Sequence, residues 1–166
     1  ATMNESRVTN HESRVGIGYD SHRFSPGGPL ILGGTTIPVE FSLAGHSDGD
    51  AVAHAVTDAV LGAAALGDIG EMFPDTEPDL RGANSMEMLR AAVARVHDAG
   101  YGVVNADVVV IAETPKVSPY RKAMRAALAE ALGVAFRFGT TIHRLDCEGD
   151  RLAGAATSAG TLQADA

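Results

Sequence analysis

The residues best suited to chemistry form two groups in this sequence, one in an extended stretch and one in a helical stretch. Asp20 and His22 are separated by one residue in "GIGYDSHRF". Alternate side chains of an extended chain point to the same side, so a carboxylate oxygen and an imidazole nitrogen can reach one ion together. Further along, Asp50, His54 and Asp58 are spaced i, i+4, i+8 and share one helical face.

A zinc site is one interpretation of these residues. Zinc takes histidine nitrogen and aspartate oxygen in tetrahedral geometry, with an open position where it is catalytic. Asp20, His22 and His54 would make such a three-ligand set, and Asp50 or Asp58 could hold the second ring nitrogen of His54. A chance D-x-H pair and a helical surface ion pair are the alternatives. A phosphate loop is disfavoured, because "GIGYDS" lacks the third glycine of the dinucleotide fingerprint and the Lys-Ser/Thr of a P-loop.

Helical periodicity indicates where some of these residues lie. The polar loop "GHSDGD" opens the first helix, which Asp48 or Asp50 could cap and which we expect to run to Gly67. A long acidic loop follows at 67–85, and loops of that length are more often functional or mobile than plain connections. The second and third predicted helices span about Ser85–Asp98 and Tyr120–Leu132.

Strand-like runs alternate with these helices. The segments "PLIL" and "TTIPV" predict a hairpin around Gly33–Gly34. The other predicted strands lie at 14–19, 102–114 and 135–142. We therefore expect an α+β fold of two layers, with helices packed on one face of a sheet.

Composition limits the possible partners. The chain has 166 residues, which suits one domain, and we expect a disordered N-terminal extension at 1–13 and a single catalytic domain at 14–166. A net charge of −8 argues against nucleic acid, which requires a basic face. The sequence has no apolar run of membrane-spanning length, so no membrane partner is expected. One cysteine, Cys147, fits a reducing compartment and predicts a cytoplasmic location.

Three stretches together resemble one enzyme family. "GYDSHRF", "GHSDGDAVAHAVTDAVLGAAALGDIGEMFPDTEP" and "AETPKVSPYRKAM" are similar to the 2-C-methyl-D-erythritol 2,4-cyclodiphosphate synthases of the non-mevalonate isoprenoid pathway. The resemblance covers about residues 14–142 and implies a homotrimer with a mixed sheet and active sites between subunits. It implies a lyase that converts 4-diphosphocytidyl-2-C-methyl-D-erythritol 2-phosphate to the 2,4-cyclodiphosphate and releases CMP. In that reaction the 2-phosphate attacks the β-phosphate of the same molecule.

The resemblance also implies residue roles. Asp20, His22 and His54 become the ligands of one Zn²⁺ per subunit, as spacing suggested, and a second divalent ion, Mg²⁺ or Mn²⁺, is expected at the phosphates. The implied catalytic residues are His46, Thr141 and Asp68. The implied substrate contacts, some from a neighbouring subunit, are Ser47, Asp68, Ile69, Gly70, Phe73, Pro74, Asp75, Thr76, Glu77, Ala112, Glu113, Thr114, Pro115, Lys116, Val117, Ser118, Thr140 and Thr141.

The chain departs from the family pattern after Thr141. Ile142 replaces a threonine, His143 stands where an acidic ligand of the second metal is expected, and Asp150 stands where an arginine is expected. Aspartate in place of arginine near a phosphate removes a bidentate donor and adds repulsion. We therefore expect rearranged phosphate contacts and a weak or absent anion site in the central cavity of the trimer.

Two other functions are compatible with these residues. One is a zinc-dependent phosphohydrolase, which would use metal-bound hydroxide and release inorganic phosphate. The other is a nucleotide-binding homologue with impaired turnover. The cyclisation needs no side-chain nucleophile, because the substrate carries its own, so it assigns no catalytic role to Cys147.

Overall fold

The computed structural model forms two compact units, Ala1–Val134 and Ala135–Ala166. The described residues are 13–77, 82–134, 142–148, 151–158 and 160–163. The predicted N-terminal extension lies, apart from its last residue, outside them.

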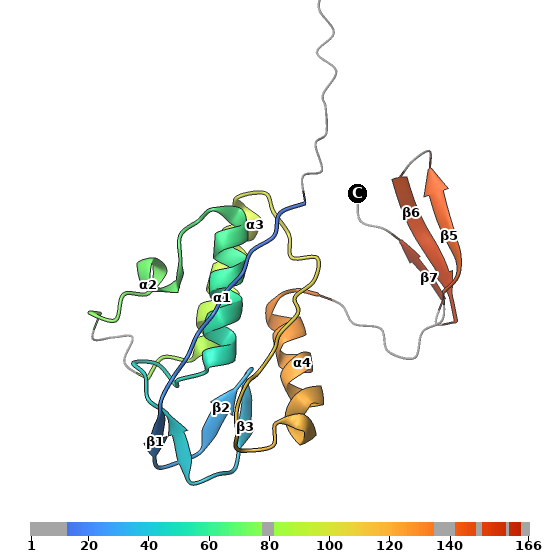
Figure 1. Cartoon of the computed structure of the whole chain (residues 1–166). Helices are drawn as coiled ribbons and strands as arrows, with labels where there is room; N and C mark the ends of the chain where they lie inside the picture. The colour runs from blue at the N-terminus through green and yellow to red at the C-terminus, as the bar shows by residue number, and fades with distance from the viewer. Residues whose placement is uncertain (1–12, 78–81, 135–141, 149–150, 159, 164–166) are drawn as a thin grey trace, which may run out of the picture. The chain divides into compact units, whose positions relative to one another are not determined.

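Four short strands make two antiparallel pairs in the first unit (Figure 1). Strand β1 (Phe24–Pro26) pairs with β4 (Phe41–Leu43), and β2 (Leu30–Leu32) pairs with β3 (Thr35–Ile37). The turn between β2 and β3 lies at Gly33–Gly34, whose φ angles of 52° and 69° suit glycine. The predicted hairpin is confirmed, whereas the pairing of β1 with β4 was not predicted.

The three long predicted helices are confirmed. Helix α1 ends at Ala64 rather than at Gly67, because Ala65 adopts the left-handed conformation with φ 58°. One short helix inside the acidic loop, α2, was not predicted. The helices are α1 (Ala51–Ala64), α2 (Ile69–Met72), α3 (Ser85–Asp98), the 3₁₀ turn η2 (Ser118–Tyr120) and α4 (Arg121–Ala131). Among the described residues, no helix has both the length and the apolar character needed to span a bilayer.

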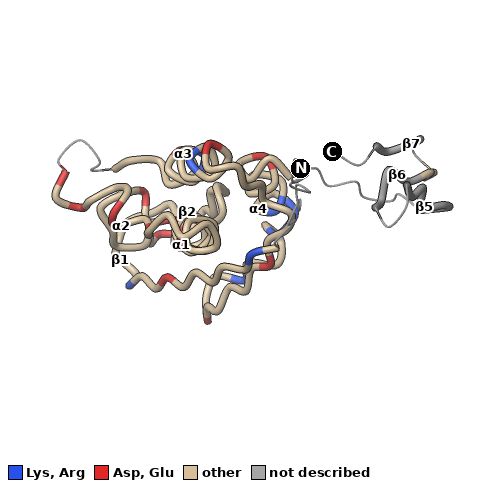
Figure 2. Tube along the Cα trace, turned by 90° about the horizontal axis from the view of Figure 1, so that it is seen from above, with Lys and Arg blue, Asp and Glu red and all other residues tan. Residues whose placement is uncertain are grey.

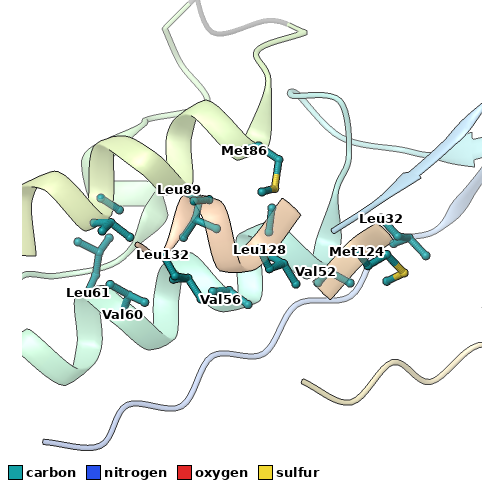
Figure 3. Close-up of a cluster of buried hydrophobic side chains, with 14 of the residues drawn as sticks. Leu32, Val52, Val56, Val60, Leu61, Met86, Leu89, Met124, Leu128 and Leu132 are labelled. Atoms are coloured by element: carbon teal, nitrogen blue, oxygen red, sulfur yellow. The ribbon is translucent and has the colours of Figure 1, made fainter. Parts of the chain in front are cut away.

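The core of the first unit lies between α1, α3, α4 and the β2–β3 hairpin. Leu61 of α1 and Leu89 of α3 are fully buried (Figure 3). Apolar residues repeat at helical spacing along α1, so one face of this helix enters the core. Helix α1 packs along α3, and α3 packs along α4. This packing makes α1 a fixed support for the polar residues near its N-terminus. The other labelled core residues are Leu32, Val52, Val56, Val60, Met86, Met124, Leu128 and Leu132.

Two predicted strands, at 14–19 and 102–114, are not strands in the structure. A strand requires hydrogen bonds to a neighbour, and no described strand pairs with either segment. Val15, Ile17 and Tyr19 still alternate along the first segment, each more than 80% exposed. The alternation of side chains is therefore present, but none of the described strands pairs with this segment.

The second unit is an antiparallel meander. Strand β5 (Ile142–Glu148) pairs with β6 (Arg151–Thr157), which pairs with β7 (Gly160–Gln163). The predicted strand at 135–142 lies outside the described residues except for Ile142, which opens β5. Helices and antiparallel pairs together confirm the α+β class. All the described strand pairs are antiparallel, so the parallel pairing of a mixed sheet is not found among them.

Candidate active site

Asp20, His22 and His54 meet at one point in the first unit, as the spacing predicts. Their ligand atoms all lie within 4.8 Å of one another. The Oδ2 atom of Asp20 is 3.0 Å from Nδ1 of His22 and 3.1 Å from Nδ1 of His54. The two rings are tilted, with centroids 5.2 Å apart. One carboxylate oxygen therefore faces two imidazole nitrogens, which is a suitable donor set for a divalent metal ion.

One atom of this triad is buried without a hydrogen-bond partner. Nδ1 of His22 is near Asp20, but the alignment makes no hydrogen bond, and the atom has no other partner. Burying a polar atom unpaired is costly, and such atoms are rare in folded proteins. A metal ion between the three side chains would use this nitrogen, so the residues fit the metal that the sequence implies.

The charge state of Asp20 also suits a ligand. Burial raises the pKa of Asp20, but the hydrogen bond with His54 and the charges of His22 and His54 together outweigh it, so the pKa lies below its usual value. The carboxylate therefore stays ionised in neutral solution, and an ionised carboxylate is the form that binds metal.

Two glycines hold the Asp20 segment against α1. The segment from residue 13 to β1 runs along α1 (Figure 1). A Cβ atom at Gly16 would lie 1.9 Å from the carbonyl oxygen of Ala59, and one at Gly18 would lie 1.8 Å from that of Ala55. Any larger residue would push the segment off the helix. The glycines of "GIGYDSHRF" thus permit a close approach of backbone to helix rather than a phosphate loop.

Asp50 fixes the start of α1, one turn before His54. It is fully buried and caps the helix through Val52 N and Ala53 N at 3.1 and 3.0 Å. The same carboxylate accepts hydrogen bonds from the backbone of the Gly33–Gly34 turn at 2.8 and 2.6 Å. One side chain therefore ties the hairpin to the helix that carries His54.

The prediction that Asp50 or Asp58 holds the second ring nitrogen of His54 was wrong. Asp50 is committed to the helix cap, and Asp58 accepts from the backbone of Ile69 at 2.8 Å. Nε2 of His54 instead meets two hydroxyls, Ser47 Oγ at 2.9 Å and Ser85 Oγ at 2.8 Å. Spacing within one helix cannot predict a contact with another helix, and Ser85 lies 31 residues from His54 in sequence.

The loops predicted to hold substrate lie beside the triad residues. His46, in the loop before α1, is exposed, and its Nε2 atom is 4.0 Å from Oδ2 of Asp75. The backbone of this loop bonds to the segment before α3, through Gly82 N to His46 O and Asp48 N to Ala83 O. The two predicted substrate segments, 46–47 and 73–77, thus approach each other at one ion pair.

The short helix α2 organises the other predicted contacts. Asp68 caps α2 through Glu71 N at 2.8 Å, and Phe73 closes it through Ile69 O. The hydrogen bond from Ile69 N to Asp58 ties α2 to α1. Ile69, Gly70 and Phe73 are therefore held in one turn beside the helix that carries His54.

One predicted substrate segment, Ala112–Ser118, makes no described contact with the triad. The segment Ala112–Ser118 is largely exposed, and the described residues show no hydrogen bond or ion pair between it and Asp20, His22 or His54. Thr140 and Thr141 lie outside the described residues, as do Asp150 and the side chain of His143.

Charge is unevenly distributed around the site. Figure 2 shows acidic residues along the chain around α2. Residues 66–77 include four acidic side chains, Asp68, Glu71, Asp75 and Glu77, and no lysine or arginine. Every charged side chain of this segment is negative, so a bound cation would reduce its repulsion of a phosphorylated ligand.

Comparison with known proteins identifies the family of this chain. The YgbB family profile matches residues 13–158. A curated relative from Gemmatimonas aurantiaca, named 2-C-methyl-D-erythritol 2,4-cyclodiphosphate synthase, is 63% identical over 121 residues, 73% of each chain. A relative of the same name from Thioalkalivibrio sulfidiphilus is 51% identical over 140 residues, 82% of this chain and 88% of its own.

Solved structures resemble the fold as well. A 2-C-methyl-D-erythritol 2,4-cyclodiphosphate synthase in its CDP-bound form superposes with a TM-score of 0.69 at 44% identity, over 74% of this chain and 81% of that one. A Plasmodium falciparum complex with CDP gives 0.62 at 34% identity, over 74% of both chains. Because the profile spans most of the chain and the curated relatives share more than half of their aligned residues with it, this chain belongs to the YgbB family.

Proposed function

We propose that this chain forms 2-C-methyl-D-erythritol 2,4-cyclodiphosphate and CMP from 4-diphosphocytidyl-2-C-methyl-D-erythritol 2-phosphate, with Zn²⁺ held by Asp20, His22 and His54. The observation that supports it most is the convergence of these three side chains, with Nδ1 of His22 buried and without a hydrogen bond among the described residues. The names of the curated relatives supply the reaction, which the site alone does not specify.

The reaction joins two anionic groups of one molecule. An oxygen of the 2-phosphate bonds to the β-phosphorus, and the bond from that phosphorus to the oxygen bridging it to the α-phosphorus breaks, so CMP leaves with that oxygen. A divalent ion at the triad would withdraw charge from the phosphate oxygens and reduce their repulsion. The protein itself would hold the 2-phosphate in line with the β-phosphorus. Holding the two groups in this geometry lowers the entropic cost of bringing them together.

The loops around the triad are the proposed binding surface. His46 and Ser47 would contact the phosphates from the loop before α1, and Asp68–Gly70 with Phe73–Glu77 would hold the methylerythritol part. The exposed His46 imidazole, whose Nε2 atom is 4.0 Å from Oδ2 of Asp75, would donate to a phosphate oxygen as charge develops in the transition state. Thr140 and Thr141 would complete the phosphate contacts, and the second divalent ion, Mg²⁺ or Mn²⁺, would bind among them.

The cytidine pocket is proposed to come from a second copy of the chain. Ala112–Ser118 is largely exposed and makes no described hydrogen bond or ion pair with the triad of its own chain. Other segments of the first unit also expose apolar residues: Val15, Ile17, Tyr19, Val104, Val109 and Ile111 are each more than 80% exposed. Apolar surface of this kind marks a protein interface. A homotrimer, in which one copy offers 112–118 to the triad of the next, accounts for both observations.

Neither alternative function is supported. A phosphohydrolase or a non-catalytic nucleotide-binding protein finds no counterpart in the relatives described above, which are named as synthases. The cytoplasmic location predicted from the single cysteine stays a prediction.

One incubation separates these functions. The full chain is mixed with the cytidyl substrate, Zn²⁺ and Mg²⁺, and the products are resolved by phosphorus NMR. Equal amounts of CMP and cyclic diphosphate are expected. Release of inorganic phosphate would indicate the hydrolase, and binding without product would indicate the nucleotide-binding homologue.

A further inference from the structure

A buried hydroxyl outside every predicted site contacts one of the metal-ligand histidines. Ser85 is the first residue of α3 and has no exposed surface. Its Oγ atom is 2.8 Å from Nε2 of His54, while Nδ1 of the same ring faces Oδ2 of Asp20 at 3.1 Å. The two ring nitrogens of His54 therefore have different surroundings, one facing the metal triad and the other facing the start of α3.

The direction of the hydrogen bond between Ser85 and His54 follows from a third residue. Ser85 Oγ also donates to Oδ1 of Asp48, and the Ser85 backbone donates to Oδ2 of the same carboxylate at 3.2 Å. A carboxylate only accepts hydrogen bonds, and a charged acceptor holds a hydroxyl proton more strongly than a neutral one does. Ser85 Oγ is also 3.1 Å from Ser47 Oγ, but the carboxylate of Asp48 is charged and is the stronger acceptor. The single proton of Ser85 therefore goes to Asp48, and Ser85 presents a lone pair to Nε2 of His54.

We propose that, once a metal ion replaces the proton that Nδ1 of His54 donates to Asp20, Ser85 accepts the Nε2–H of His54, with its own proton held by Asp48. Ser85 is thus a positioning residue that reserves Nδ1 for the metal. Outer partners of this type fix the orientation of a ligating histidine and decide which nitrogen binds. The inference rests on the proposed function, since it assumes that the triad holds a metal ion.

Ser47 also contacts Nε2 of His54, but its position differs. It lies in the loop before α1, where it is partly exposed and accepts from Gly49 N at 3.2 Å. Ser85 begins a helix that is anchored in the core by Met86 and Leu89. Ser85 is thus the fixed acceptor, and Ser47 can exchange its contact for a substrate oxygen without releasing the ring.

The test compares zinc affinity among variants of the full chain, by competition with a chromophoric chelator. Ser85→Ala removes the acceptor, and the loss of such an outer partner weakens metal binding by about 10–100-fold. Asp48→Asn keeps the size of the side chain but can donate to Ser85 Oγ, which frees the serine proton to face Nε2. Asp48→Asn is therefore also expected to weaken zinc binding. The matched control is Thr57→Val, which deletes another fully buried hydroxyl, one bonded to Ala53 O.

A second readout separates positioning from general loosening of the fold. In the zinc-loaded wild type, proton NMR should show a slowly exchanging Nε2–H resonance from His54. Ser85→Ala and Asp48→Asn should lose that resonance or make it exchange quickly, whereas Thr57→Val should keep it. Asp48→Asn leaves Ser85 in place, so the comparison stands even where Ser85→Ala folds poorly.

The outcomes distinguish this inference from the proposed function. Weaker zinc binding in both variants, with the control unchanged, supports the role of Ser85. If the wild type binds zinc and releases CMP while Ser85→Ala and Asp48→Asn bind zinc equally well, the positioning role alone is overturned. If the wild type binds no zinc, the proposed function fails and the inference fails with it.

Discussion

Gly18 lies so close to α1 that a Cβ atom on it would stand 1.8 Å from the carbonyl oxygen of Ala55. The segment that carries Asp20 and His22 therefore rests directly on the backbone of the helix that carries His54. This contact sets the distance between the two halves of the metal triad.

We expect Gly18→Ala to weaken zinc binding, because the segment must move away from α1 and draw Asp20 from His54. Overpacking of this kind costs about 1–3 kcal/mol of stability. Zinc affinity and thermal unfolding together measure both effects. Gly62→Ala, on an open face of α1, is the matched control and should keep zinc affinity and raise stability slightly. Wild-type zinc affinity in Gly18→Ala would show that this contact does not position the triad.

Asp50→Ala should destabilise the chain more than loss of an ordinary helix cap. Asp50 accepts four backbone hydrogen bonds while fully buried. Its removal leaves the amides of the Gly33–Gly34 turn unpaired, and we expect a loss of roughly 2–4 kcal/mol in urea unfolding. Asn84→Ala removes the simpler cap of α3 and should cost about 1 kcal/mol. Equal losses in the two variants would contradict a double role for Asp50.

Arg90 of α3 and Glu130 of α4 form an ion pair at 2.5 Å, which predicts a specific pH response. The hydrogen bond from Arg90 lowers the pKa of Glu130 below its ordinary value of 4.5. A lowered carboxyl pKa adds stability that is present above pH 4.5 and is lost as the pH falls through the folded value. Carbon NMR of the Glu130 carboxyl should show this low midpoint, and Arg90→Gln should return it to the ordinary value. Identical midpoints in the two proteins would show that the pair does not form in solution.

The exposed apolar alternation at Val15, Ile17 and Tyr19 predicts an interface. If the chain is a trimer, Ile17→Lys places a charge in that interface and should shift the sedimentation of the protein toward the monomer. Ser13→Lys adds the same charge at an exposed polar position nearby and should leave the trimer intact. A wild type that sediments as a monomer, or an Ile17→Lys protein that stays trimeric, would contradict this assignment.

Much of the site could be predicted from local pattern. The D-x-H spacing and the helical position of His54 identified the triad, and glycine chemistry identified the β2–β3 turn, because both depend on residues close in sequence. The contacts of Ser85 and Asp58 could not be found in this way, since each depends on how separate elements pack. The predictions of strands at 14–19 and 102–114 were wrong for a related reason, because a strand also requires a neighbouring strand to pair with. The single-domain boundary at 14–166 stays a prediction.

The proposed reaction requires that Asp20, His22 and His54 together hold one metal ion. Zinc content measured on the purified full chain tests it most directly. We predict about one zinc per chain in the wild type and a near-complete loss in His54→Ala, because two ligands hold zinc far less well than three. Full zinc content in a folded His54→Ala protein would contradict the ligand set and the function built on it.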